Sequence, residues 1–265
     1  MGSRLSVSTN GAQGVVRIAA AGDVHCGPHN RDETLRAFAA LDGRCDLVLL
    51  AGDLTTHGHP DQAAIVVEAA ALCGAPVLAV LGNHDHHDGC VEEVVRVLDE
   101  GGVEVLERGF SVQTCGGVSV GVVGAKGFVG GFPGSSLPDF GEPLLREVFA
   151  ETTREAEAID RGLQAVARCA IRVVLLHYAP VQSTLEGEPE GIHTFLGSER
   201  LAPPIDRHRP DLVLHGHAHA GRLRGAIGEV PVYNVSVPVM QRDFWLFELT
   251  GTVTEKRADV TLGTA

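Results

Sequence analysis

The chain has 265 residues, of which 44% are hydrophobic and 21% charged, as in an ordinary globular protein and unlike a disordered one. Its formal net charge of -13, without a long basic stretch, argues against binding a nucleic-acid polymer. No apolar run approaches the roughly 20 residues that span a bilayer. Residues 1–14 are polar and unlike a signal peptide, so we expect a flexible tail there and a single domain over residues 15–265.

Short apolar runs recur along the chain and predict β-strands. The first three runs are nearly continuous, as expected for strands that are buried on both faces of a sheet. The predicted strands cover Val15–Ala21, Leu47–Ala51, Val77–Leu81, Val118–Val123, Val173–Leu176, Leu212–Leu214, Val230–Val235 and Phe244–Leu249.

Helical patterns lie between these runs. They cover Arg31–Leu41, Pro60–Cys73, Val91–Glu100 and Pro143–Cys169. The alternation of strand and helix over the first half predicts right-handed βαβ units. The second half is richer in strands and turns, which predicts a second sheet.

Two stretches fit neither pattern: residues 125–141 and residues 182–197. Loops of this length in a compact domain are often functional. They are either surface insertions or segments that line a substrate cleft, in which case Phe128, Phe132 and Phe140 would offer an apolar face to a base or an acyl group.

Five short polar segments follow apolar runs, each where the chain should leave a buried strand. They are Gly22-Asp23-Val24-His25, Gly52-Asp53, Gly82-Asn83-His84-Asp85, Leu176-His177-Tyr178 and Gly216-His217-Ala218-His219. Each segment alone is a weak signal. Together they supply the carboxylates, imidazoles and neutral amide oxygen that suit a pair of Mn, Fe, Zn or Ni ions better than Mg or Ca. Such a pair favours in-line displacement at phosphorus.

In this order the segments resemble the calcineurin-like metallophosphoesterase superfamily, whose pattern runs D-x-H, G-D, G-N-H-[D/E], H, G-H-x-H. The resemblance extends from about residue 17 to the final strands, and the spacing is similar to the class III cyclic-nucleotide phosphodiesterase branch. It implies a mixed α/β fold: a four-layer αββα sandwich of two mixed sheets flanked by helices, with the metals at the carboxyl ends of strands.

The same resemblance assigns roles by position. One metal would be held by Asp23, His25 and His219 and the other by Asn83, His177 and His217, with Asp53 bridging the two ions. A metal-bridging water with a pKa lowered toward about 7 would attack phosphorus in line. His84 would act as the acid for the leaving group, and Asp85 would orient His84.

The remaining candidates carry weaker signals. We expect His215 to be structural, because strand alternation points it away from His217. Five histidines are expected to face solvent, although two of them, His57 and His87, lie close enough in sequence to touch substrate; the five are His57, His59, His86, His87 and His193. Arg222 and Arg242 are possible phosphate-binding cations. The six cysteines form no C-x-x-C pair, which favours free thiols in the cytoplasm.

The expected function is hydrolysis of a small phosphoester, most simply a diester such as a cyclic nucleotide. The superfamily's protein phosphatases place arginines after the G-D and G-N-H-E motifs, and no arginine directly follows Asp53 or Asp85 here. A phosphomonoesterase or protein phosphatase is the alternative, and an inactive binding module of the same fold is a third reading. A homo-oligomer is possible, and no membrane contact is expected.

Overall fold

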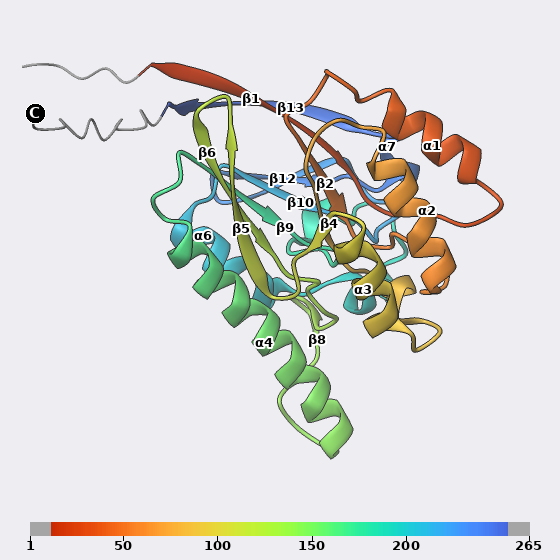
Figure 1. Ribbon diagram of the computed structural model, residues 1–265. Helices are drawn as coiled ribbons and strands as arrows, with labels where there is room; N and C mark the ends of the chain where they lie inside the picture. Colours follow the sequence, from red (N-terminus) through yellow and green to blue (C-terminus); the bar gives the residue numbers. More distant parts are fainter. Residues whose placement is uncertain (1–11, 254–265) are drawn as a thin grey trace, which may run out of the picture.

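The computed structural model describes residues 12–253. Its centre is formed by two large mixed sheets (Figure 1). The first has five strands in the order β13-β1-β2-β3-β4, and all pairs are parallel except that of β13 with β1. These strands are β1 (Gln13–Ala21), β2 (Leu47–Ala51), β3 (Val77–Val80), β4 (Val103–Val105) and β13 (Trp245–Thr252).

The second sheet has six strands in the order β11-β12-β10-β9-β6-β5. Its four central strands are parallel, and an antiparallel strand closes each edge. The strands are β5 (Gly109–Cys115), β6 (Val118–Gly124), β9 (Ile171–Leu175), β10 (Leu212–His215), β11 (Arg224–Ile227) and β12 (Val230–Asn234). A small hairpin of β7 (Gly131–Phe132) and β8 (Ser135–Ser136) lies apart from both sheets.

Helices cover the outer faces of the two sheets (Figure 1). The first sheet carries α1 (Arg31–Ala39), α2 (Pro60–Ala70) and α3 (Val91–Glu100), and the second carries α4 (Pro143–Ala165) and α6 (Ala202–His208). Shorter segments are α5 (His193–Leu196), α7 (Val237–Met240), η1 (His84–His86), η2 (Gln182–Thr184), η3 (Glu190–Ile192) and η4 (Glu199–Leu201).

Two apolar clusters hold these layers together. The larger joins the inner faces of both sheets, for example Leu49 of β2 with Leu175 of β9, and continues to the first three helices. The smaller packs α4 against the second sheet through Ile159 and Leu163. The expected architecture of two mixed sheets flanked by helices is therefore confirmed.

Most predicted elements lie within a few residues of the observed ones, and the differences are at their ends. The helices expected to reach Leu41, Cys73 and Cys169 end earlier, at Ala39, Ala70 and Ala165. The expected tail over residues 1–14 lies outside the described residues except at its end, where Gln13 and Gly14 already belong to β1. The six cysteines are free, as expected, and within residues 12–253 no helix has the length and apolar character that crossing a bilayer requires.

Candidate metal centre

All five polar segments directly follow the carboxyl ends of strands β1, β2, β3, β9 and β10, as predicted. Parallel strands present these ends at one edge of a sheet, which gathers the segments within each sheet. The two edges meet: the backbone N–H of His217 donates to both carboxylate oxygens of Asp23, at 3.1 and 2.9 Å. The site is therefore built at the junction of the two sheets.

Strained backbone marks this junction. Asp23, His25, Asp53 and His217 have φ angles of 59°, 45°, 50° and 69°, in the left-handed region that non-glycine residues rarely adopt. Such conformations cost about 1–3 kcal/mol each and collect at functional sites. The fold holds these four residues in unfavourable conformations where their side chains converge.

The glycines that precede the polar residues allow close approach. A Cβ at Gly82 would lie 2.1 Å from Oδ1 of Asp53, and a Cβ at Gly216 would lie 2.4 Å from Oδ2 of Asp23. Any larger residue would collide with a carboxylate at the centre of the site. Only glycine therefore fits at positions 82 and 216.

The first group of donors is Asp23, His25 and His219, whose ligand atoms all lie within 4.8 Å of one another. Nε2 of His219 is 2.9 Å from Oδ1 of Asp23. Burial raises the pKa of Asp23, but the hydrogen bond from His219 and the nearby imidazole of His177 outweigh burial and hold that pKa below its ordinary value. The buried Nδ1 of His25 has no hydrogen-bond partner among the described residues.

The second group is Asp53, His177 and His217, also within 4.8 Å of one another. Nδ1 of His177 lies 2.9 Å from the carbonyl oxygen of Ala51 and donates to it. Its Nε2 is then a bare lone pair, yet it lies 2.9 Å from Oδ1 of Asn83 and 3.4 Å from Oδ1 of Asp53. Three electron-pair donors facing one another without a proton fit a bound cation.

His217 is oriented in the same way. Its Nε2–H donates to the carbonyl oxygen of Phe195 at 3.2 Å, which leaves Nδ1 free. Burial and the neighbouring His177 lower the pKa of His217 to about 3. The imidazole is therefore neutral, the state that a metal ligand requires.

Asp53 lies between the two groups. Its Oδ2 is 3.8 Å from Nε2 of His25, while its Oδ1 faces His177. The side chain is buried, and Oδ1 also accepts the backbone N–H of His84 at 2.8 Å. Each oxygen of this carboxylate therefore faces a different group of donors.

The half-exposed side chain of His84 stands beside this pair of groups, and a ring nitrogen of His84 lies within 4.8 Å of ligand atoms of both His25 and Asp53. Its Nδ1–H donates to the carbonyl oxygen of Thr56 at 2.8 Å, and its Nε2 is 3.9 Å from Oδ2 of Asp53. The His84 ring meets that of His25 edge to face, with centroids 4.5 Å apart. The free Nε2 is thus directed toward the centre.

The prediction that Asp85 orients His84 needs correction, because the Thr56 carbonyl holds that ring instead. The fully buried Asp85 carboxylate accepts four hydrogen bonds: from the N–H groups of Gly82, Leu54 and Thr55, and from Oγ1 of Thr55. Asp85 therefore fixes the loop after β3 to the loop after β2 and makes no hydrogen bond to the His84 imidazole.

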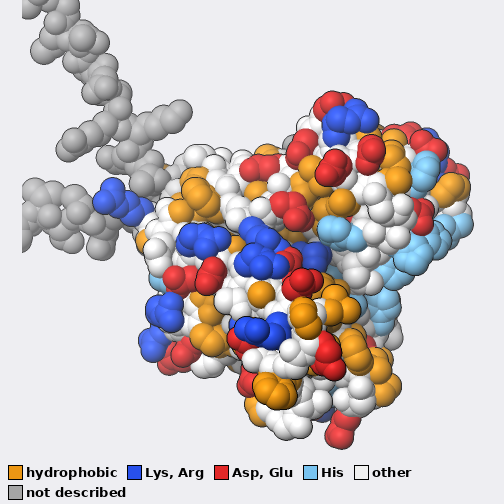
Figure 2. Space-filling view, turned by 90° about the horizontal axis from the view of Figure 1, so that it is seen from below, with side chains coloured by type: hydrophobic (Ala, Val, Ile, Leu, Met, Phe, Trp, Pro, Cys, Tyr) orange, Lys and Arg blue, Asp and Glu red, His pale blue; other side chains and the backbone are white. Residues whose placement is uncertain are grey.

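The other histidines divide as follows. His215 is structural, as expected: it is buried between the carbonyl oxygen of Gly216 and the hydroxyl of Thr184. His193 does not face solvent as predicted, because it is buried and bonds the carbonyl oxygen of Glu188. Figure 2 shows imidazoles gathered along one side of the face it draws; the exposed histidines that follow the second and third motifs are His57, His59, His86 and His87.

The two arginines named as possible phosphate-binding cations are engaged elsewhere. Arg222 pairs with Glu186 at 2.8 Å, and Arg242 lies over the ring of Trp245 at 4.5 Å. Their partners are not members of the two donor groups.

The two unassigned stretches pack against each other beside the site. Within 125–141 the hairpin β7–β8 contacts α5 of the other stretch, and the N–H of Gly131 donates to the carbonyl oxygen of Gly197 at 2.9 Å. Phe132 is buried in a small cluster with Leu185 and Leu196. We call residues 125–141 and 182–197 together the cap.

The three phenylalanines that would offer an apolar face to substrate differ in their surroundings. Phe132 is internal, and Phe128 meets the ring of Tyr178 at 5.8 Å. Phe140 is 79% exposed. One residue that sequence reasoning missed is Phe195, which is 62% exposed and whose carbonyl holds His217. Only the three-dimensional contact reveals it, because no motif surrounds Phe195.

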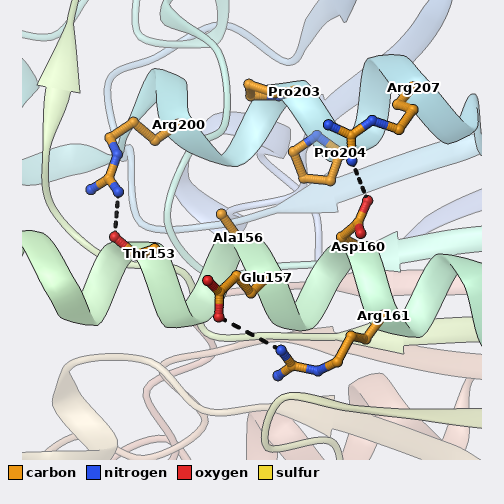
Figure 3. A pocket seen from close by; sticks show the side chains of 9 residues that line it. All are labelled: Thr153, Ala156, Glu157, Asp160, Arg161, Arg200, Pro203, Pro204 and Arg207. Atoms are coloured by element: carbon orange, nitrogen blue, oxygen red, sulfur yellow. Dashed lines mark hydrogen bonds and ion pairs between the residues drawn. The ribbon is translucent and has the colours of Figure 1, made fainter.

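A cavity of about 370 Å³ lies away from the donor groups, between α4 and α6 (Figure 3). Its three arginines already have partners: Arg207 pairs with Asp160 at 2.6 Å, Arg161 with Glu157 at 3.7 Å, and Arg200 bonds the hydroxyl of Thr153. None of its lining residues belongs to the donor groups.

Residues 16–221 match the family model described as calcineurin-like phosphoesterase. The chain belongs to this family. Calcineurin-like phosphoesterases use a dinuclear transition-metal centre. The two donor groups that the oxygens of Asp53 face fit such a centre. The protein is therefore a metal-dependent phosphoesterase, which agrees with the resemblance of its motifs.

Solved structures show the same fold as this phosphoesterase. Phosphopantetheinyl hydrolase (PptH) from Mycobacterium tuberculosis is 18% identical, with a TM-score of 0.61 over 83% of this chain and 89% of that chain. The protein TT1561 of Thermus thermophilus is 21% identical, with a TM-score of 0.54 over 91% of this chain and 100% of that chain. A putative 5'-nucleotidase from Staphylococcus aureus is 16% identical, with a TM-score of 0.52 over 92% and 55%. None of the curated proteins matches the sequence significantly.

Proposed function

We propose that this phosphoesterase hydrolyses small phosphodiesters, with Asp23, His25 and His219 holding one metal ion and Asn83, His177 and His217 the other. The observation that carries the proposal is the position of Asp53, whose two oxygens face the two donor groups. When bound, the two ions activate water at neutral pH and neutralise charge on the phosphoryl oxygens.

His84 is the proton donor in this proposal. Its Nδ1–H is fixed by Thr56, so its Nε2 is the nitrogen that meets substrate. In its protonated form Nε2–H donates to the departing alkoxide, a task that contributes about 10²–10⁴ in rate. Asp85 supports this indirectly, since it fixes the loop that carries His84.

The preference for a diester rests on the charges near the centre. A dianionic monoester is best held by arginines that bind two of its oxygens at once. The segments after Asp53 and Asp85 contain histidines but no arginine, and Arg222 and Arg242 are engaged elsewhere. A monoanionic diester needs less positive charge, and cyclic nucleotides, which the class III resemblance suggests, belong to this class.

The alternative is a monoesterase, and the name of one structural neighbour, a putative 5'-nucleotidase, keeps it open. Another neighbour is called a phosphopantetheinyl hydrolase. Proteins of this fold thus act on different phosphoesters, and in this proposal the cap selects which ester reaches the metal centre.

The test compares bis-4-nitrophenyl phosphate with 4-nitrophenyl phosphate, using protein loaded in turn with Mn²⁺, Fe²⁺, Zn²⁺ and Ni²⁺. We expect turnover of the diester to exceed that of the monoester and to be abolished by EDTA. Faster hydrolysis of the monoester and of a phosphopeptide would favour the alternative. A protein that binds two metal equivalents but cleaves nothing would be a binding module.

A further inference from the structure

Lys126 is the only lysine between residues 12 and 253. It follows β6, and its carbonyl oxygen accepts the N–H groups of both His177 and Tyr178 at 3.0 Å. These bonds fix its backbone to the segment that carries a proposed metal ligand. The position of the lysine is therefore set by the same contacts that build the centre.

The ammonium group of Lys126 has few partners of its own. It lies 4.5 Å from the centre of the Phe128 ring and 5.3 Å from that of Tyr178, and its one hydrogen bond, to the carbonyl oxygen of Gly127, is long at 3.4 Å. Within residues 12–253 it makes no ion pair. The aromatic rings hold the charge in place, while at least two of its three N–H donors remain unused.

One aromatic ring separates this ammonium from the metal centre. The centroid of the Tyr178 ring lies 4.5 Å from that of the His217 ring and 5.4 Å from that of the His177 ring. On another side Lys126 lies within electrostatic range of His86, which follows the third motif. The ammonium thus lies beside the site, between the loops after β3 and β6.

Four further charged groups lie within electrostatic range of Lys126: Glu107, Arg108, Glu151 and Glu155. Arg108 bonds the carboxylates of both Glu151 and Glu155, and Glu155 also accepts the N–H of Gly127 at 2.8 Å. Glu107 is exposed and makes no ion pair with the lysine. These carboxylates favour the charged form of the partly buried Lys126 without occupying the donors of its ammonium group.

We propose that Lys126 binds a second anionic group of the substrate, a carboxylate or a phosphate one ring away from the scissile phosphoryl group. The inference rests on the proposed function and narrows it to esters with two separated negative charges. Because Tyr178 lies between the ammonium and His217, the group that meets the lysine belongs to a more distant part of the substrate than the oxygens at the metals.

The test uses two diesters that differ only in this charge: bis-4-nitrophenyl phosphate and 4-carboxyphenyl 4-nitrophenyl phosphate. The nitro and carboxylate groups have nearly the same shape. We expect the wild-type enzyme to have a lower KM for the carboxylate ester. The ratio to compare is kcat/KM for the carboxylate ester divided by kcat/KM for bis-4-nitrophenyl phosphate. In Lys126→Gln this ratio should fall about tenfold, the scale of one charge-assisted hydrogen bond. Lys126→Arg should retain most of the ratio.

Arg96→Gln is the matched control, because Arg96 is an exposed cation on α3 that pairs with Glu100; its ratio should equal that of the wild type. A merely structural role of Lys126 would lower both kcat/KM values equally, and that result, or a wild type without preference, would overturn the assignment while the proposed function stands. No turnover of either ester by metal-loaded wild-type protein would overturn the proposed function and the role of Lys126 with it.

Discussion

We expect individual side chains at the centre to have separable roles, and Asp53 is the one whose two oxygens face both donor groups. It is buried, it has positive φ, and its two oxygens face different groups. We therefore expect Asp53→Ala to lose most activity and at least one of two bound metal equivalents. Metal analysis of the purified variant by mass spectrometry checks this. The control is Asp32→Ala, which removes an exposed carboxylate of α1; two retained equivalents in Asp53→Ala would contradict the bridging position.

We expect His84 to contribute to chemistry rather than to the metal content. Its ring is held by Thr56, and it is not one of the seven proposed ligands. His84→Ala should keep both metals and lower kcat by about 10²–10⁴. Steady-state kinetics with metal analysis on the same sample measure both quantities. His208→Ala, on α6, should leave kcat unchanged, and full activity in His84→Ala would show that another group protonates the leaving oxygen.

At the scale of elements, the loops after β2 and β3 depend on Asp85. Its buried carboxylate satisfies three backbone N–H groups and one hydroxyl. Asp85→Ala leaves these donors unpaired, so we expect a loss of about 2–4 kcal/mol in the free energy of unfolding. Urea unfolding at neutral pH measures the loss. Asp88→Ala, at an exposed position of the same loop, should change stability by under about 0.5 kcal/mol.

The cap should affect substrate choice more than chemistry, because it places an exposed aromatic ring beside a proposed ligand. Phe195→Ala keeps the carbonyl that holds His217 but removes the ring. We expect KM for bis-4-nitrophenyl phosphate to rise about threefold to tenfold, with a smaller change for a glycerophosphodiester, on the scale of one aromatic contact. Equal changes for both esters would show that the ring only stabilises the cap. The control is Phe140→Ala, another exposed phenylalanine of the cap.

Sequence patterns predicted the elements whose signals are local. The strands β1, β2 and β3 are continuous apolar runs, and the third helix has an apolar stripe with glycines at its end, so both were found. β4 has three residues and the strands of the cap hairpin have two each; such segments carry no periodicity. Neither the pairing of the two cap stretches nor the hydrogen bonds from Leu54 and Thr55 to Asp85 leave a local trace, because each joins residues far apart in the chain.

The same distinction applies to the site. The five motifs could be found because each is a short string with its own residue types. The roles of Tyr178, Lys126 and Phe195 could not, since they follow from rings and carbonyls brought together by the fold. Sequence reasoning therefore predicts candidate metal ligands more readily than the residues that would select a substrate.

For the whole molecule, metal binding should couple to stability. Asp23 and Asp53 are buried carboxylates in strained backbone. A cation bound between them offsets the free-energy cost of the burial and of the strain, and it can do so only in the folded state. A metal ion at about 100 times its Kd should raise the free energy of unfolding by roughly 2.7 kcal/mol. For a chain of this size this corresponds to a rise of about 5–10 °C in Tm. Calorimetry with and without EDTA measures the shift. The same shift in Asp53→Ala would show that it arises elsewhere.

The bond from the His217 amide to the Asp23 carboxylate joins residues 194 positions apart in the chain. Each of the two donor groups thus combines residues from both halves of the polypeptide. During synthesis, a nascent chain that has emerged only through the first four strands has Asp23, His25, Asp53 and Asn83 but lacks three of the seven proposed ligands. On the proposed ligand set, a complete centre therefore forms only after the segment that carries His217 and His219 has been made.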